Sequence, residues 1–273
     1  MNLDPAAAAV GIGLVACGDI DSTNAEALRR ARAGEHGPLW VTARSQSAGR
    51  GRRGRAWVSP SGNLYASLLL SDPSPAAVAP QLSFVAALAL HDAAVAVASG
   101  IASGFRLKWP NDMLCNGAKV AGILIEGEGT RPLAIAIGIG VNCMHHPEMT
   151  DYPATDLAAS GVQAAPDAVF RALSGAMVER LQQWDRGAGF ASIRADWLAR
   201  ASGIGGDIRV RLAERELTGR FESLDPSGRL ILGLPGGGVE AIAAGDVVPL
   251  HQIAGASAPR QGPSVGSDRG RNS

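Results

Sequence analysis

A run of arginines and glycines constrains this chain more than any other part of its sequence. Residues 49–55 read GRGRRGR, and almost none of these side chains can enter an apolar core. Four guanidinium groups in six residues stay charged and repel one another, so the run is loose until an anion enters it. Glycine lets backbone N–H groups turn toward that anion, and arginine offers paired hydrogen bonds to phosphate or carboxylate. The run is therefore predicted to be a loop between strands 39–43 and 63–70, and composition alone supports a solvated basic turn or a nonspecific nucleic-acid patch at least as well as an anion-binding site.

The overall charge limits which anion such a loop can serve. The 273 residues include 25 Lys+Arg and 25 Asp+Glu, so the formal net charge is zero. That balance excludes a strongly basic nucleic-acid binder as a description of the whole chain. With 46% hydrophobic and 18% charged residues, the chain has ample material for a core. We expect a globular protein with charge concentrated locally.

The cysteines and the apolar stretches indicate a cytoplasmic protein. Cys17, Cys115 and Cys143 lie far apart with no CxxC spacing, which argues against a disulfide framework and a zinc site and fits a reducing compartment. The apolar residues before Cys17 lack the basic start of a secretory signal and predict a buried strand at 12–17. The stretch 82–98 is interrupted by polar residues, so it predicts a core helix rather than a membrane span.

Turn residues and apolar periodicity divide the rest of the chain. Asn116-Gly117 predicts a type I′ hairpin turn between strands 112–115 and 119–126, because both central residues of that turn need positive φ. Thr23 and Glu26 form a capping-box pattern that opens a helix ending at Gly34. The other expected elements are strands at 105–109 and 132–141 and helices at about 75–99, from 166 and at 190–200.

A change of pattern after residue 203 predicts a second domain. Four short strands are expected at 208–212, 217–224, 229–234 and 239–243, with a strong turn sequence at Asp225-Pro226-Ser227-Gly228. The predicted organisation is a catalytic domain at 1–203, a small β domain at 204–252 and a disordered tail at 253–273 that is rich in Gly, Ser, Pro and Arg.

Two basic clusters outside the loop have both plain and functional interpretations. Residues 108–112 read KWPND, which is an ordinary strand-to-turn sequence or a lysine and an amide aimed at a nucleotide. Lys119 begins an apolar strand, where it either reaches solvent or provides a fixed cation for a carboxylate. Taken alone, each cluster favours its plain interpretation.

Several other polar positions do not identify a reaction by themselves. Gly138, Gly140 and Asn142 fit either a bulged strand end or bare backbone under a flat ligand, and they lack the rest of a dinucleotide fingerprint. His145-His146 is expected to be a surface pair, since no ligand pattern joins it. Ser22, Thr23 and Asn24 most simply cap the first helix, and could equally bind a polar ligand head. The sequence has no GxxxxGK[ST] phosphate loop.

Five groups of residues, taken together and in order, closely resemble the biotin protein ligase family. The resemblance covers roughly 13–250, and its most specific part is the pairing of GRGRRGR with KWPND and KVAGIL. It implies an α+β fold, with a mixed β-sheet and flanking helices like those of class II aminoacyl-tRNA synthetases, plus a small C-terminal SH3-like barrel. The five groups are 21–24, Gln46 with 49–57, 108–112, 119–124 and 138–142.

The resemblance implies a two-step ligase reaction. Biotin's carboxylate attacks the α-phosphate of ATP to give biotinyl-5'-AMP, and a lysine of a biotin carboxyl carrier domain then attacks the acyl carbon. Cations near the reacting anions would offset their repulsion, and a loop ordered over the intermediate would exclude water. Mg²⁺ is expected for the ATP step, with Asp112 as its nearest candidate ligand.

The resemblance also assigns roles to single residues. Lys119, Arg52 and Lys108 are the expected catalytic cations. The expected biotin contacts are Ser22, Thr23, Asn24, Gln46, Arg50, Gly51, Arg52, Lys119, Gly122 and Gly138. The expected ATP and adenylate contacts are Arg53, Arg55, Trp57, Lys108, Asn111 and Asn142.

Two alternatives remain at this stage. A lipoate or octanoate ligase on a related fold would differ in the acid used, and the arginine loop favours biotin. A nucleic-acid-binding module is disfavoured by the zero net charge. Some members of the family carry an N-terminal helix-turn-helix, and residues 21–24 lie too near Met1 to leave room for one. We therefore expect a ligase with no DNA partner, no membrane partner, no repressor activity and at most weak homodimerisation.

Overall fold

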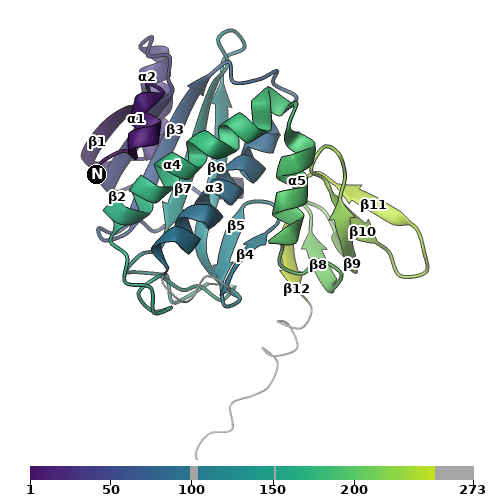
Figure 1. The fold of residues 1–273 in the computed structure, drawn as a ribbon. Coiled ribbons are helices and arrows are strands. Elements are labelled where there is room, and N and C mark those ends of the chain that lie inside the picture. Colours follow the sequence, from purple (N-terminus) through teal and green to yellow (C-terminus); the bar gives the residue numbers. More distant parts are fainter. Residues whose placement is uncertain (99–103, 151, 250–273) are drawn as a thin grey trace, which may run out of the picture.

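The computed structural model describes residues 1–98, 104–150 and 152–249 and contains two sheets whose buried residues belong to one continuous core (Figure 1). The first is a seven-stranded mixed sheet in the order β1-β2-β3-β7-β6-β5-β4. Its strands are β1 (Gly13–Ile20), β2 (Leu39–Gln46), β3 (Leu64–Ser71), β4 (Phe105–Lys108), β5 (Asp112–Cys115), β6 (Ala118–Glu128) and β7 (Ala134–Val141). This mixed sheet with its helices confirms the predicted α+β class.

Only β1 and β2 run parallel among the described strands of this sheet, because α2 (Thr23–Arg32) crosses between them. The other neighbours pair antiparallel, including the hairpin of β5 and β6. Asn116 and Gly117 both have positive φ, at 49° and 83°, which confirms the predicted turn chemistry.

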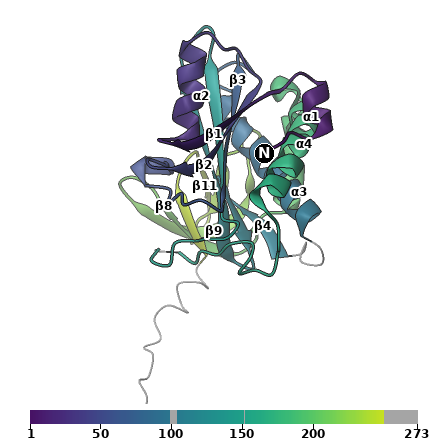
Figure 2. The same cartoon turned by 90° about the vertical axis from the view of Figure 1, so that its left-hand side faces the viewer.

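Helices cover the two faces of the large sheet unequally. Figure 2 shows α2 on one side and α1 (Pro5–Ala9), α3 (Leu82–Val97) and α4 (Pro166–Trp184) on the other. The α3–α4 side holds the main core, whereas α2 covers a small separate cluster around Val41 and Leu69. Most of the α2 side of the sheet is therefore free to form a site.

The α3 helix shows how the apolar stretch is used. Residues Ala79–Val97 are long and apolar enough to cross a membrane by composition. In the fold, however, most side chains of α3 are buried between the sheet and α4. The predicted start at residue 75 was too early, because the α-helix begins at Leu82 after a 3₁₀ turn at Ala79–Gln81.

The second sheet is antiparallel, with the order β11-β10-β9-β8-β12, and lies within the predicted small domain. This sheet docks on α5 (Phe190–Ala199), where Arg194 donates to the carbonyl of Leu224. A second contact comes from the end of β4, where the Trp109 indole donates to the carbonyl of Gly228 at 3.2 Å. The predicted tail at 253–273 lies outside the described residues. The strands are β8 (Asp207–Arg211), β9 (Glu216–Leu224), β10 (Leu230–Gly233), β11 (Val239–Ile242) and β12 (Asp246–Pro249).

Candidate active site

Three glycines on neighbouring strands form a side-chain-free floor on the α2 face of the large sheet. Gly122 pairs with Gly140, and Gly138 lies two residues before Gly140 on β7, on the same face of the sheet. A Cβ on Gly138 would come within 2.4 Å of Asn24 Oδ1, and one on Gly140 within 2.6 Å of Trp57 Nε1. Glycine is required here because a helix residue and a loop tryptophan lie directly on the backbone.

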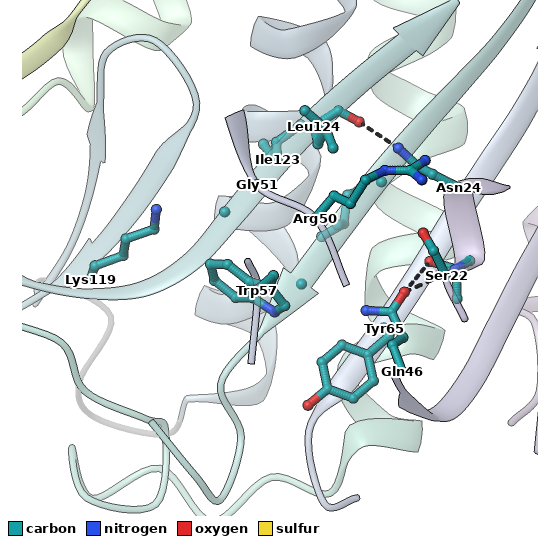
Figure 3. Close-up of a pocket in the computed structure, with 15 residues that line it drawn as sticks. Ser22, Asn24, Gln46, Arg50, Gly51, Trp57, Tyr65, Lys119, Ile123 and Leu124 are labelled. Atoms are coloured by element: carbon teal, nitrogen blue, oxygen red, sulfur yellow. Dashed lines mark hydrogen bonds between the residues drawn. The ribbon is translucent and has the colours of Figure 1, made fainter. Parts of the chain in front are cut away.

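A cavity opens above this floor, and we call it the sheet cavity (Figure 3). It has about 470 Å³ of unfilled space, including its open mouth. Figure 3 shows Lys119 and Asn24 toward opposite ends of it, with Trp57 between them. Its lining includes Ser22, Thr23, Asn24, Gln46, Arg50, Gly51, Trp57, Tyr65, Lys119, Gly122, Leu124, Gly138 and Gly140.

A hydrogen-bond network fixes the polar wall at the α2 end of the sheet cavity. Ser22 caps α2, so the helix begins one residue earlier than the Thr23–Glu26 capping box implied. Thr23 is free of the capping role, and its N–H and hydroxyl donate to Gln46 Oε1 at 2.8 and 3.1 Å. Buried Ser67 lies 2.7 Å from Thr23 Oγ1 and 2.6 Å from Asn24 Oδ1, so its single proton serves one of them at a time.

The same network continues from Asn24 to the arginine loop. The Asn24 amide donates to the carbonyl of Leu124 at 3.2 Å and to Glu126 Oε2 at 2.8 Å. Arg50 donates to the same Glu126 oxygen at 2.9 Å, which holds the start of the arginine loop against the mouth of the cavity. The oxygen and the nitrogen of the Asn24 amide both have protein partners, which fix the orientation of the amide group.

Hydrogen bonds from β2 and β3 hold the segment that follows the arginine loop. Tyr65 donates to the carbonyl of Pro60 at 2.7 Å, and burial raises the pKa of its hydroxyl to about 12. Gln46 donates through Nε2 to Ser59, whose hydroxyl donates to the carbonyl of Trp57. These bonds connect β2 to the segment that follows the arginine loop and so fix where Trp57 lies.

Lys119 is held at the other end of the sheet cavity by three groups. Its Nζ lies 2.6 Å from Asp112 Oδ1, with both side chains about 15% exposed, as a close ion pair rather than an aligned hydrogen bond. The rings of Trp57 and Tyr152 lie 5.3 and 5.2 Å from Nζ, within reach of a cation–π attraction. The ammonium group is thus fixed at one point.

A second cavity, which we call the loop cavity, lies on the far side of Trp57 and Lys119. It has about 590 Å³ of unfilled space, including its open mouth, and is largely apolar. Buried Asn142 lines it, although its amide already donates to the carbonyl of Thr155 at 3.0 Å. The remaining lining is Ala56, Val58, Pro147, Met149, Thr150, Tyr152 and Ala154.

The rest of the arginine loop contacts the small domain instead of either cavity. Arg52 donates to Asn111 Oδ1 at 3.2 Å and to the carbonyl of Gly245 at 3.3 Å. Arg53 and Arg55 lie 3.3 and 3.1 Å from the carboxylate oxygens of Asp246. Burial lowers the pKa of Arg52, which the nearby acidic groups partly offset. The loop is anchored here, in contrast to the loose segment expected from its charge.

Lys108 lies close to these groups, opposite Asp112 in the β4–β5 pair. Burial lowers the pKa of its ammonium group, the nearby Asp112 counteracts this shift, and Lys119 adds to it. A cation with a lowered pKa beside other cations is a candidate partner for a ligand anion.

The described residues contain no group of three or more His, Cys, Asp or Glu side chains that could together hold a metal ion. Asp112 offers one carboxylate beside Lys119. Magnesium is commonly held by one or two carboxylates together with substrate phosphates, so this arrangement fits an ion that arrives with a nucleotide. His146 pairs with Asp156 at 2.6 Å, a partner that the sequence did not reveal.

The structure groups the expected site residues unevenly. The expected biotin contacts line the sheet cavity with the exception of Arg52, and Trp57 and Asn142 line the loop cavity. Lys108, Asn111, Arg53 and Arg55 lie outside both. Five residues of the site were not predicted from the sequence: Ser67, Glu126, Tyr65, Tyr152 and Asp246. Two of them could have been noticed, because Ser67 and Glu126 are polar residues inside otherwise apolar strands.

Sequence comparison accounts for this arrangement. Residues 18–142 match the Biotin/lipoate A/B protein ligase family, and residues 203–248 match the Biotin protein ligase C terminal domain. A biotin--[acetyl-CoA-carboxylase] ligase of Paracoccus denitrificans is 47% identical over 80% of this chain and 92% of its own length. This chain belongs to the biotin protein ligase family. A ligase of the same name from Mycobacterium tuberculosis is 37% identical over 84% of this chain and 86% of its own length.

The fold agrees with solved biotin protein ligases. The Aquifex aeolicus biotin protein ligase in complex with biotin and ATP superposes with a TM-score of 0.73 and 25% identity. The match covers 86% of this chain and 97% of that one. Both sheets of the present structure therefore have counterparts in the family, including the small C-terminal sheet.

Proposed function

We propose that this protein is an ATP-dependent ligase in which the sheet cavity binds biotin, the loop cavity binds the adenosine of ATP, and Lys119 lies where the reacting groups meet. One observation carries the proposal: Lys119 and Trp57 line both cavities. Two ligands bound on either side of them would bring their charged ends to the same ammonium group. Membership of the biotin protein ligase family supplies the identity of the acid.

The first step joins the two anions. A biotin carboxylate oxygen attacks the α-phosphorus, the bond to the β-phosphate breaks, and pyrophosphate leaves. Biotin's carboxylate is ionised at neutral pH, so this step needs no general base. Its barrier comes from charge repulsion, which a fixed cation lowers without reorganising during the reaction. Lys119, held by Asp112 and two rings, meets that requirement.

The second step transfers the acyl group. The amine of an acceptor lysine attacks the acyl carbon, the bond to the bridging oxygen breaks, and AMP leaves. The acceptor we propose is a lysine of a biotin carboxyl carrier domain, as the names of the relatives from Paracoccus and Mycobacterium suggest. The anhydride must not meet water before the acceptor arrives, and the arginine loop across the mouth of the sheet cavity would exclude it.

The polar wall suits a neutral, flat ligand head. Biotin's ring system offers two N–H donors and one carbonyl acceptor, and the Ser22–Asn24 segment, Gln46 and Tyr65 present hydroxyl and amide groups in orientations already fixed by the network. The glycine floor lets that flat head approach the backbone closely. Preformed polar groups of this kind reject analogues that cannot pair with them.

The cations outside the cavities are assigned to the phosphates. We propose that Arg53, Arg55 and Lys108 contact the β- and γ-phosphates, and that Arg52 and Asn111 connect this group to β6. Their guanidinium and ammonium groups suit that task. Asp112 would hold Mg²⁺ together with the phosphates, and the ion would neutralise developing charge when bound.

The cysteines indicate the compartment in which the reaction takes place. We propose a cytoplasmic enzyme that acts without DNA or membrane partners, without repressor activity and with at most weak homodimerisation. Three unpaired cysteines, two of them buried, fit a reducing compartment.

The test incubates the protein with biotin and α-labelled ATP and follows labelled biotinyl-AMP and pyrophosphate. An apo carrier domain is then added, and the label should leave as AMP while the carrier gains biotin. A parallel reaction contains lipoate in place of biotin. Adenylate with lipoate and none with biotin would overturn the assignment.

A further inference from the structure

A single carboxylate of the small domain holds two arginines of the arginine loop. Asp246, the first residue of β12, lies 3.3 Å from Arg53 through Oδ2 and 3.1 Å from Arg55 through Oδ1. Each guanidinium uses its own oxygen, so the two do not compete. The Asp246 side chain is 28% exposed, whereas those of Arg53 and Arg55 are 37% and 53% exposed, so the carboxylate is the least exposed member of the cluster.

Neighbouring bonds keep this contact in register. Arg53 also donates to the carbonyl of Arg211 on β8, and Arg52 donates to the carbonyl of Gly245, the residue before Asp246. Arg52, Arg53 and Arg55 therefore all contact the same part of the small sheet, where β8 and β12 pair. The loop residue Arg53 adopts a left-handed backbone with φ of 57°, which the surrounding contacts must hold in place.

We infer that Asp246 is a positioning residue for ATP: its carboxylate sets the spacing and direction of the Arg53 and Arg55 guanidinium groups before the polyphosphate arrives. This inference rests on the assignment of those arginines to the phosphates in the proposed function, and it extends that site to a residue of the small domain.

The physical reason is the cost of ordering like charges. Two long cationic side chains that lie close together repel each other and sample many rotamers when nothing holds them. A carboxylate between them offsets the repulsion and fixes both guanidinium groups. The two side chains are then already ordered when ATP binds. Biotin, bound at the glycine floor, contacts neither arginine and should not depend on Asp246.

The experiment measures adenylate formation by wild type and Asp246→Asn while ATP and biotin are varied separately. Asparagine keeps the shape and removes the charge. We expect the KM for ATP to rise about tenfold, the scale expected when two side chains must be ordered on binding, with the KM for biotin unchanged. Asp246→Glu should recover part of the loss. An unchanged or lower KM for ATP in Asp246→Asn would overturn the inference.

Two controls separate positioning from folding. Glu240→Gln removes a comparable ion pair, with Arg215, within the same small domain and should leave both KM values unchanged. In an Arg53→Gln/Arg55→Gln background, Asp246→Asn should add no further change in the KM for ATP, and an additive change would contradict the inference. A wild-type protein that forms no biotinyl-AMP would instead overturn the proposed function.

Discussion

Lys119 Nζ lies 2.6 Å from Asp112 Oδ1 at the point where the sheet cavity and the loop cavity meet. The pair comes from adjacent strands of the β5–β6 hairpin, whose turn the sequence specifies through Asn116-Gly117. The hairpin thus fixes a cation and a carboxylate side by side. An incoming carboxylate and phosphate would find the ammonium group already oriented.

Removal of this cation should slow adenylate formation more than it weakens binding. For Lys119→Met we expect the rate of biotinyl-AMP formation to fall by about 10²–10³-fold, the range found when one fixed donor is removed from a site of developing charge. Single-turnover formation of labelled adenylate measures it. Lys119→Arg keeps the charge and should retain more activity than Lys119→Met; equal loss in the two variants would argue against an electrostatic role.

The glycine floor predicts a selective loss of biotin binding. In Gly138→Ala the new Cβ would lie 2.4 Å from Asn24 Oδ1, so the amide must move away from the position that the network gives it. We expect the Kd for biotin, measured by calorimetry, to rise at least tenfold, or about 1.4 kcal/mol. Gly18→Ala on β1 is the matched control, since its Cβ would meet nothing within 4 Å. Tight biotin binding by Gly138→Ala would show that Asn24 is not part of the site.

The buried Ser67 hydroxyl should matter although it lies behind the cavity wall. In Ser67→Ala, Asn24 Oδ1 and Thr23 Oγ1 lose their shared donor, at a cost of about 1 kcal/mol for one hydrogen bond. We expect the Kd for biotin to rise about fivefold while the KM for ATP stays constant. Ser71→Ala, at the far end of the same strand, should change neither value. A change in the KM for ATP alone would contradict this account.

Lys108 predicts an alkaline limit on ATP use. Its folded-state pKa is lowered by burial, so it loses its charge at a pH below the range of an ordinary lysine. The KM for ATP should therefore rise as pH increases through that lowered pKa, by about tenfold when one charge-assisted bond is lost. Lys108→Arg, which stays charged, should remove the alkaline rise. If the rise persists in Lys108→Arg, another group causes it.

The lowered pKa of Lys108 should weaken ATP binding at alkaline pH but increase the stability of the fold there. Because the folded pKa of Lys108 lies below its unfolded value, the unfolded state binds more protons in the window between them. The free energy of unfolding should therefore gain a contribution from this group as pH rises through that window. Thermal unfolding of wild type and Lys108→Met across alkaline pH would show this difference, and identical pH profiles would argue against a lowered pKa for the Lys108 ammonium group.

Local chemistry made much of the fold predictable. The hairpin at Asn116-Gly117 follows from the positive φ that its turn demands. The strand after Lys119 is apolar because one of its faces is buried on the α3 side of the sheet, while glycine lies on the other face. The capping box failed by one residue because Thr23 forms hydrogen bonds with Gln46 and Ser67. Local pattern cannot foresee that competition.

Long-range partners explain what the sequence could not predict at the site. The arginine run was correctly read as a loop, but Asp246 lies more than 190 residues away along the chain. Glu126 likewise joins Arg50 to Asn24 across 76 and 102 residues. Such contacts depend on how two sheets dock, which no local periodicity encodes.

In the proposed reaction, a biotin carboxylate oxygen attacks the α-phosphorus of ATP beside Lys119. The most direct measurement uses biotin labelled with oxygen-18 in its carboxylate, together with ATP and an apo carrier domain, and follows the label by mass spectrometry. The account predicts one labelled oxygen in the released AMP and the other in the amide carbonyl of the biotinylated carrier. AMP without label, or label in inorganic phosphate, would contradict it.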